Sequence, residues 1–512
     1  MSRTTRFLSG VGLGYFSQVV LTIAGLWLTP FLLSRLGGYE YGLWLVSLQL
    51  QAYLTLIDFG VLALLSRDIA MSVGKAGGIN SATDLQAIVG RSGRLVLWQM
   101  PVLALLAAGL WLLMSGEWGT LRWPLGLMLL TFVVLYPLRI FSVMLYGLQD
   151  HGFNAKAQFA SWLAGFIVTV VCVVAGGRLY ALSAGWAVTQ ALMPALVYWR
   201  LRTRFPTLLP ERLPRVAWPD ARGQLGRGVW LSANQVAQIL LAGTDLVMIG
   251  KLLGPEAVVG YAITGKLVTV LANQPIMLGV VAGPALAEIT TGESRERMSH
   301  ASTALGQAIL LLSGAIACVV LAVNKGFVAW WVGPQQYGGF VLTAAFVVGM
   351  VLRHWNVGLG AVLFSLGHEK RLCQSYLADG IVTVITGVIL VLAIGPVGAP
   401  LGSIIGVMVA SLPMNLTVLI RAKSATPGML MSAYGPWLWR FVLMALLAAT
   451  AGRAWAPGGF VTIAGTASLV ALLYGLVMLP VMLRAPIGSY VRPRLAPLGS
   501  RVCRALGVGN PA

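Results

Sequence analysis

Apolar runs of twenty or more residues, almost free of charge, recur from one end of the chain to the other. About 20 helical residues span the roughly 30 Å hydrocarbon layer of a membrane, where a helix satisfies its own backbone polar groups. Of the 512 residues, 58% are hydrophobic and only 10% are charged, against about 25% charged in soluble domains. The sequence therefore predicts an all-α polytopic membrane protein.

Fourteen transmembrane helices account for the apolar runs. The first run is longer than the roughly 7–15-residue core of a cleaved signal peptide, so we predict an uncleaved span. The predicted spans are 8–33, 41–66, 93–115, 122–147, 156–176, 179–200, 227–251, 258–287, 302–323, 338–366, 372–394, 398–420, 434–452 and 460–483.

The charges between the spans predict the orientation of the chain. If the N-terminus is cytoplasmic, the loops and tails on that side hold 25 Lys and Arg residues, the opposite side holds six, and four lie within spans. By the positive-inside rule both termini are cytoplasmic. The net charge of +20 then indicates contact with anionic lipid headgroups rather than nucleic acid.

An internal repeat predicts two lobes. "SRLGGYE" at 34–40 aligns with "GKLLGPE" at 250–256, and each follows the first span of a six-span block. We predict a pseudo-two-fold parallel repeat, with an N-lobe at 1–205, a basic linker at 206–226, a C-lobe at 227–423, two further spans within 424–485 and a basic cytoplasmic tail at 486–512.

No motif of a soluble catalytic chemistry is present. The sequence has no phosphate loop, no H-E-x-x-H and no nucleophile elbow, and its four cysteines are scattered, so we predict no cofactor, no metal site and no ATP hydrolysis. A membrane glycosyltransferase or ligase is a weaker alternative, because the predicted outward loops are short and offer little beyond Glu40, Glu117 and Glu256.

Three stretches resemble a known family: "FLLSRLGGYEYGLW" with "LTLIDFGVLALLSRD" within 31–68, "LRIFSVMLYGLQDHGFNAK" at 138–156 and "TDLVMIGKLLGPEAVVGYA" at 244–262. The pattern resembles Wzx-type polysaccharide flippases, of the superfamily that also contains multidrug and toxic compound extrusion transporters and lipid II flippases. The resemblance implies two six-helix lobes around a V-shaped central cavity. It also implies that spans 13 and 14 stand where related lipid II flippases form a groove for a polyprenyl tail.

Of the four basic side chains within predicted spans, Arg440 is predicted to be an anchor at the membrane interface, and Arg139, Lys266 and Arg353 are predicted to lie deeper. Intramembrane charges usually face a bundle interior or a watery cavity, and Arg and Lys suit phosphate oxygens. We predict that these three hold the pyrophosphate of a lipid-linked oligosaccharide. The alternative, left open by the sequence, is that they pair with neighbouring carboxylates or carbonyls, or extend to the membrane surface.

Three acidic side chains, Asp58, Asp245 and Asp379, are also predicted within spans. A desolvated carboxylate either takes up a proton or keeps a cation partner, so we predict a role in ion coupling or gating. For Asp58 a purely structural role remains open.

The sequence thus predicts a flippase of the bacterial inner membrane, not an enzyme. Its predicted cargo is a polyprenyl-pyrophosphate-linked oligosaccharide for lipopolysaccharide O-antigen or another surface polysaccharide. Predicted partners are the membrane lipids and a polysaccharide polymerase with its chain-length machinery. A multidrug antiporter of the same fold is the alternative. Such a transporter should have an acidic cavity that suits cationic drugs, and the three basic residues predicted within the membrane argue against it.

Overall fold

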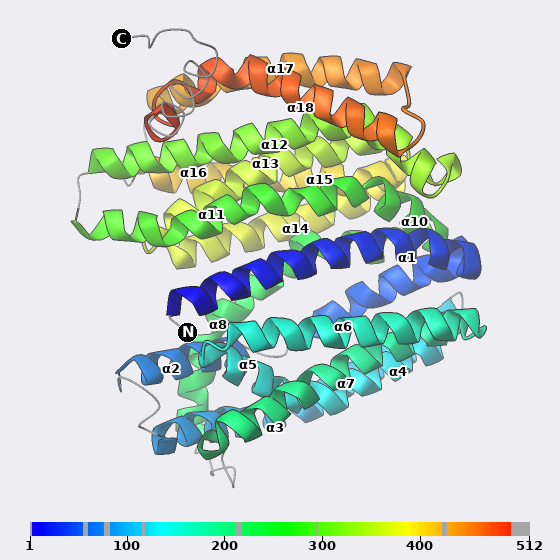
Figure 1. Ribbon diagram of the computed structural model, residues 1–512, viewed down its shortest axis with the longest axis vertical. Coiled ribbons are helices and arrows are strands. Elements are labelled where there is room, and N and C mark those ends of the chain that lie inside the picture. The colour runs from blue at the N-terminus through cyan, green and yellow to red at the C-terminus, as the bar shows by residue number, and fades with distance from the viewer. Residues whose placement is uncertain are drawn as a thin grey trace. The chain divides into compact units, whose positions relative to one another are not determined.

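The structure, a computed structural model, describes residues 3–54, 60–75, 82–114, 118–209, 218–292, 295–421 and 427–492, which contain helices and no β-strand (Figure 1). The α-helices are α1 (Arg3–Leu54), α2 (Val61–Lys75), α3 (Ala82–Leu113), α4 (Gly119–Leu135), α5 (Arg139–Gly147), α6 (His151–Val174), α7 (Arg178–Arg204), α8 (Trp218–Ala242), α9 (Asp245–Leu252), α10 (Pro255–Thr264), α11 (Lys266–Gly292), α12 (Arg295–Trp331), α13 (Phe340–Ser365), α14 (Glu369–Ile394), α15 (Gly398–Gly406), α16 (Leu412–Arg421), α17 (Pro427–Ala454) and α18 (Phe460–Met482). Short 3₁₀ turns are η3 (Tyr136–Leu138), η4 (Pro206–Leu208), η5 (Pro334–Gln336) and η6 (Gly395–Val397), and η7 (Val407–Ser411) is a π-helix.

The helices confirm the predicted all-α membrane class. In the described part of the chain, nine helices are long and apolar enough to cross a membrane, or eleven if two bent pairs each count as one span. Two of the nine contain a sharp turn: α1, 52 residues long, breaks at Gly37 (φ 78°), and α14 meets α15 through Gly395 (φ 73°) and η6. The helix count is therefore compatible with the predicted fourteen.

Several helices are polar inside and apolar outside. On α6, Ser161, Gly165 and Thr169 are buried at four-residue spacing, whereas another face exposes Leu163, Ile167, Val171 and Val174. On α14, Asp379 and Thr383 are buried, whereas Ile381, Ile385, Ile389 and Leu392 are exposed. Exposed apolar stripes opposite small and polar residues are typical of helices that face lipid and pack through small residues.

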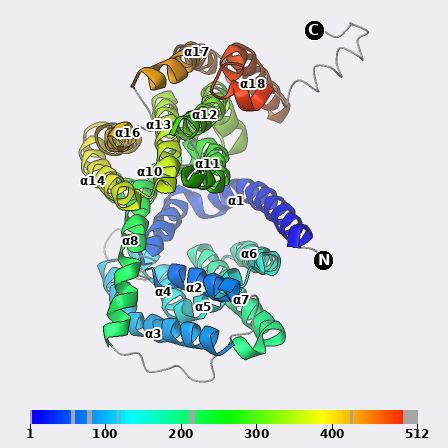
Figure 2. The ribbon, with the colours of Figure 1, turned by 90° about the vertical axis from the view of Figure 1, so that its left-hand side faces the viewer.

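The chain divides into two compact units, Met1–Val259 and Gly260–Ala512, with the division inside α10. The finer domain boundaries predicted from the sequence stay predictions. Figure 2 shows the ribbon turned by 90°, with α8 and α3 of the first unit seen along their length.

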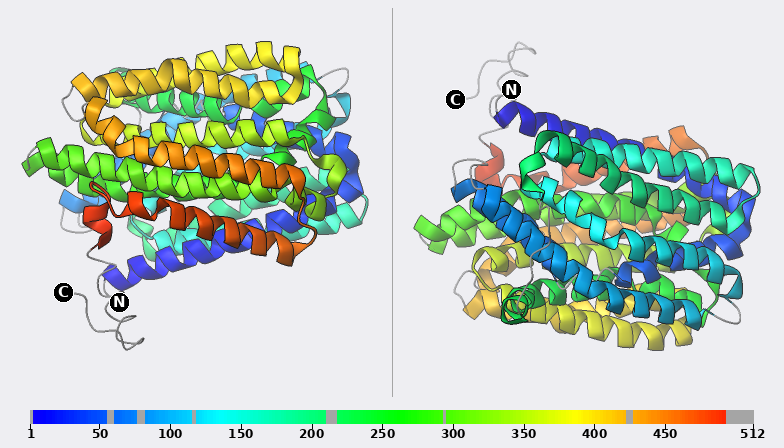
Figure 3. Two further views of the ribbon diagram at one scale, coloured as in Figure 1. Left: turned by 90° about the horizontal axis from the view of Figure 1, so that it is seen from above. Right: turned by 90° about the horizontal axis from the view of Figure 1, so that it is seen from below.

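The first unit contains α1 to α9. Helices α6 and α7 cross where Gly165 and Gly185 meet, and a Cβ at either position would overlap the backbone carbonyl of the other. Helix α4 packs on α7, and α8 on α2. Figure 3 shows α3, α6 and α7 from below.

The two copies of the repeated motif approach each other within this unit. A Cβ at Gly42, just after the first copy, would overlap the carbonyl of Pro255 in the second copy. In addition, a Cβ at Gly250 would touch Val46. Only glycine permits this approach of backbone to backbone.

In the second unit, α12 is central. It packs on α11 and α13, and α17 and α18 both lie on it, as the view from above in Figure 3 also shows. A cluster of buried apolar side chains joins α11, α12, α13, η7 and α16: Leu286, Met298, Leu359, Val362, Leu363, Val407, Leu412 and Leu419.

Candidate functional site

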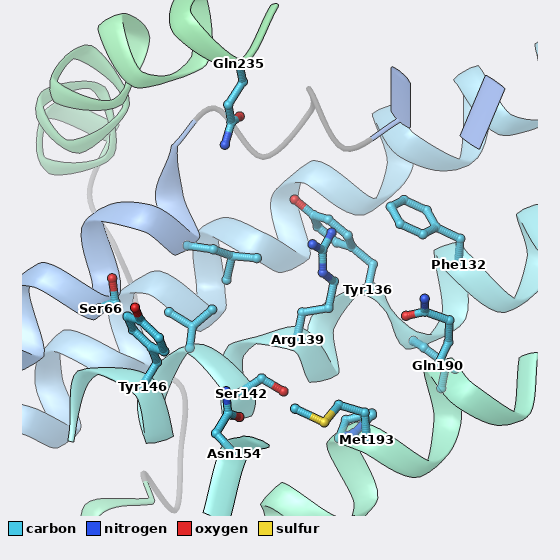
Figure 4. A pocket seen from close by; sticks show the side chains of 14 residues that line it. Ser66, Phe132, Tyr136, Arg139, Ser142, Tyr146, Asn154, Gln190, Met193 and Gln235 are labelled. Atoms are coloured by element: carbon cyan, nitrogen blue, oxygen red, sulfur yellow. The ribbon is translucent and has the colours of Figure 1, made fainter. Parts of the chain in front are cut away.

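A cavity of about 440 Å³ lies inside the first unit, around Arg139. Figure 4 shows side chains from α2, α4, η3, α5, α6, α7 and α8 around it. The described lining residues are Leu62, Ser66, Phe132, Leu135, Tyr136, Arg139, Ser142, Val143, Tyr146, Asn154, Gln190, Met193, Pro194 and Gln235. Its volume lies in the range of about 300–1,000 Å³ typical of ligand pockets.

A helix break positions Arg139. Pro137 lacks a backbone N–H and cannot continue the hydrogen bonding of α4, so the chain passes through the 3₁₀ turn η3 and α5 begins at Arg139. Tyr136, in the turn, is fully buried and donates a hydrogen bond from its hydroxyl to Gln99 Oε1 at 3.1 Å. The break is thereby anchored to α3, and the first residue after it faces the cavity.

The guanidinium of Arg139 has no anionic partner among the described residues. Its central carbon lies 5.8 Å from the centre of the Phe132 ring and 5.9 Å from that of Tyr136. Its Nη1 atom is buried and makes no hydrogen bond. A buried, unpaired N–H of a charged group is costly, which makes Arg139 a candidate for anion binding.

The described lining contains Arg139 as its one charged residue. Around it stand neutral polar groups, among them the carboxamides of Asn154, Gln190 and Gln235. Asn154 Oδ1 and Gln235 Oε1 are also buried without a hydrogen bond. The cavity is therefore positive and rich in hydrogen-bonding groups.

Arg353 has a different environment. It lies on α13 of the second unit, and two of its guanidinium nitrogens are each 3.5 Å from a different oxygen of Asp379 on α14. Its Nε donates to Ser403 Oγ at 2.7 Å. The pairing with a neighbouring carboxylate that the sequence left open is thus what the structure shows for Arg353.

Asp379 is completely buried. Besides Arg353, it accepts hydrogen bonds from Thr383 at 3.0 Å and from Ser411, which the π-helix η7 presents. π-helical turns are rare and occur frequently at functional sites.

The remaining predicted residues are not among the described residues that line the Arg139 cavity. Lys266, half-buried, is the first residue of α11, at a 50° bend after α10 in the second unit. Asp245, also half-buried, is the first residue of α9, at a 48° bend after α8, within electrostatic range of Tyr53. Asp58 lies outside the described residues.

Sequence reasoning missed the neutral half of the cavity. It singled out Arg139 because an ionisable residue stands out within an apolar run. Asn154, Gln190 and Gln235 are uncharged and come from α6, α7 and α8. Their only sequence signal was that each is an amide within or beside a predicted span.

Comparisons with known proteins agree with this architecture. Residues 149–304 match the family model described as polysaccharide biosynthesis protein. A structure of the lipid II flippase MurJ in an inward closed conformation is similar at a TM-score of 0.63 and 10% identity, covering 92% of this chain and 100% of that one.

Two multidrug transporter structures are also similar. An inward-facing multidrug resistance MATE family transporter of the MOP superfamily has a TM-score of 0.58 and 15% identity, covering 80% of this chain and 98% of that one. The structure of the MATE multidrug transporter DinF-BH in complex with R6G has a TM-score of 0.52 and 12% identity, covering 82% of this chain and 95% of that one. No curated protein matches the chain.

The fold is therefore that of the membrane transporters of the MOP superfamily, the multidrug, oligosaccharidyl-lipid and polysaccharide exporters. This fold and the match of residues 149–304 to polysaccharide biosynthesis proteins agree with the resemblance that was predicted from the sequence.

Proposed function

We propose that this protein is a flippase that moves a polyprenyl-pyrophosphate-linked oligosaccharide across the bacterial inner membrane, from the cytoplasmic to the periplasmic leaflet, for surface polysaccharide synthesis. The observation that carries the proposal is the buried, unpaired Nη1 of Arg139 in a cavity whose described lining has no carboxylate. The match of residues 149–304 to polysaccharide biosynthesis proteins supports it.

The phosphate of the cargo would supply the anionic partner that Arg139 lacks among the described residues. A guanidinium presents a planar fork of donors that matches phosphate oxygens. A hydrogen bond to a charged group contributes about 1.5–3 kcal/mol, and a phosphate on Arg139 adds a charge attraction and a bidentate geometry that a neutral or cationic ligand does not offer. A cationic drug would be repelled by the same side chain.

Alternating access is the proposed mechanism. Lys266 and Arg353 of the second unit are also proposed to bind phosphate, Arg353 only in a state in which Asp379 has released it. Asp379, Asp245 and Asp58 are proposed for coupling or gating, because a change in the protonation or pairing of a carboxylate alters the cost of moving it within a membrane. A polysaccharide polymerase with its chain-length machinery is the proposed partner for the flipped product.

Complementation of a deletion strain tests the role of Arg139. Arg139→Gln removes the charge and keeps a polar side chain, so we expect surface glycan to fall by about ten-fold or more, since the lost bond is worth at least about 1.4 kcal/mol. Lipid-linked oligosaccharide should accumulate in the inner leaflet. Glycan is measured by gel and protein abundance by immunoblot.

Arg122→Gln is the matched control. Arg122 also has a buried, unpaired nitrogen, Nε, but it stacks on Trp111 and does not line the cavity. Normal glycan with Arg139→Gln would contradict the proposal. Increased drug susceptibility of the deletion strain with normal glycan would favour a multidrug antiporter instead.

A further inference from the structure

The Arg139 cavity contains three buried polar atoms without a hydrogen-bond partner among the described residues: Arg139 Nη1, Asn154 Oδ1 and Gln235 Oε1. They come from α5, α6 and α8. In the view of Figure 4, Gln235 extends from α8 toward Arg139, and Asn154 lies on the other side of Arg139. Most buried polar groups in proteins are hydrogen-bonded, so three unpaired atoms in one cavity point to a missing ligand.

The three atoms need different kinds of hydrogen-bond partner. Arg139 Nη1 is a charged donor and pairs with an anion. The two carboxamide oxygens are acceptors and need donors. A phosphate or pyrophosphate alone, which offers acceptors, would satisfy Arg139 and leave both oxygens unpaired. The complete ligand must therefore carry donors close to its phosphate.

The surroundings restrict what those donors are. No carboxylate among the described lining residues could neutralise an ammonium group, which leaves neutral donors such as hydroxyls. The rings of Phe132, Tyr136 and Tyr146 line the same cavity and offer apolar surfaces to the C–H faces of a sugar. The volume of about 440 Å³ lies in the lower half of the range for ligand pockets, which suits one sugar with its phosphate.

We propose that Asn154 and Gln235 bind hydroxyl groups of the sugar joined directly to the phosphate on Arg139, and so select a neutral, hydroxyl-bearing glycosyl phosphate. This inference rests on the proposed function and deepens it. Asn154 and Gln235 are specificity residues in this arrangement, whereas Arg139 binds the phosphate common to all such cargoes. The bound sugar also joins α6 to α8.

Binding measurements on the purified full-length chain in detergent test the assignment. The probes are glucose 1-phosphate and inorganic phosphate, and calorimetry gives both affinities. We expect the wild type to prefer glucose 1-phosphate by about ten-fold or more, since each hydroxyl bond contributes about 1 kcal/mol and two are made.

Asn154→Leu and Gln235→Leu should each remove most of that preference while leaving the affinity for inorganic phosphate within about two-fold. Unchanged phosphate binding shows that the cavity is still folded. Gln158→Leu is the control, because Gln158 is exposed one turn further along α6. Arg139→Gln should weaken the binding of both probes.

A wild type without a preference for glucose 1-phosphate, or variants that retain the preference, would overturn the inference. Loss of glycan export in Arg139→Gln cells would then leave the proposed function standing. Normal export in those cells would remove the proposed function whatever the binding data show.

Discussion

Arg139 and Arg353 show how one residue type takes two roles. Arg139 has no acidic partner among the described residues and lines a cavity, whereas Arg353 contacts the buried Asp379 through two nitrogens. The Arg353 side chain is only 23% exposed, so the pair is largely removed from water. Breaking such a pair leaves a buried charge without compensation.

We expect Asp379→Asn to destabilise the protein by about 3 kcal/mol, the lower end of the range for broken buried pairs, because Arg353 is partly exposed and retains Ser403. Thermal unfolding in detergent, followed by tryptophan fluorescence, measures the loss. Glu369→Gln is the control, since Glu369 is an exposed carboxylate on the same helix. Equal melting temperatures for the two variants would show that the pair contributes little to stability.

The sequence identified the charged residues of both sites but not their environments. Arg353 and Asp379 are 26 residues apart on different helices, and no periodicity in a single sequence reports that two helices bring them together. Asn154 and Gln235 were missed for the same reason, since the cavity exists only where α6 and α8 meet other helices.

At the level of elements, glycines on α12 position α17 and α18. A Cβ at Gly306 would overlap the Tyr434 hydroxyl, and a Cβ at Gly314 would overlap that of Tyr474. Tyr474 also accepts a hydrogen bond from Trp437 Nε1 at 3.1 Å. The last two helices thus pack on α12 through tyrosines that need small residues opposite them, as is common between membrane helices.

Gly314→Ala should therefore weaken the packing of α17 and α18 by about 1–3 kcal/mol, the usual cost of an inserted methyl group in a packed interior. Gly475→Ala on α18 is the matched substitution, because nothing lies within 4 Å of its Cβ, and it should be neutral or slightly stabilising. The melting temperature in detergent reports the difference. The prediction fails if both alanine variants behave alike.

Element boundaries were predicted best where glycine or proline interrupts an apolar run. The turn between the first two predicted spans is at Gly37, and that between spans 11 and 12 is at Gly395. In the second copy of the repeat, however, the positive φ is at Gly254, which aligns with Gly38 rather than Gly37. The aligned motifs therefore turn one residue apart, because the second copy has Leu253 where the first has Gly37, and a positive φ favours glycine.

For the whole molecule, composition was sufficient to predict an all-α membrane protein, because repeated apolar runs of about 20 residues match the thickness of the hydrocarbon layer when they are helical. The orientation in the membrane is still a prediction based on the excess of Lys and Arg on one side. Residues at opposite ends of the predicted spans provide a direct test. Arg204, at the end of α7, and Gln335, in the turn between α12 and α13, are both exposed.

In a cysteine-free background, we expect Gln335→Cys to react with a membrane-impermeant maleimide in intact cells. Arg204→Cys should react only after the inner membrane is permeabilised, because the basic segment that follows α7 is predicted to be cytoplasmic. Labelling is followed by gel shift, and the cysteine-free parent gives the background. The opposite pattern would reverse the orientation and, with it, the proposed direction of transport.

The close approach of the two repeated motifs has a consequence for how the proposed transport cycle could be stopped. Gly42 lies against the carbonyl of Pro255 without room for a Cβ. If a conformational cycle separates these two segments, they can come together again only when residue 42 has no side chain. A valine at this position would act only on the joined state, and the protein would accumulate in whichever conformation keeps the motifs apart. A single extra side chain would thus hold the proposed cycle in one conformation without touching the cargo.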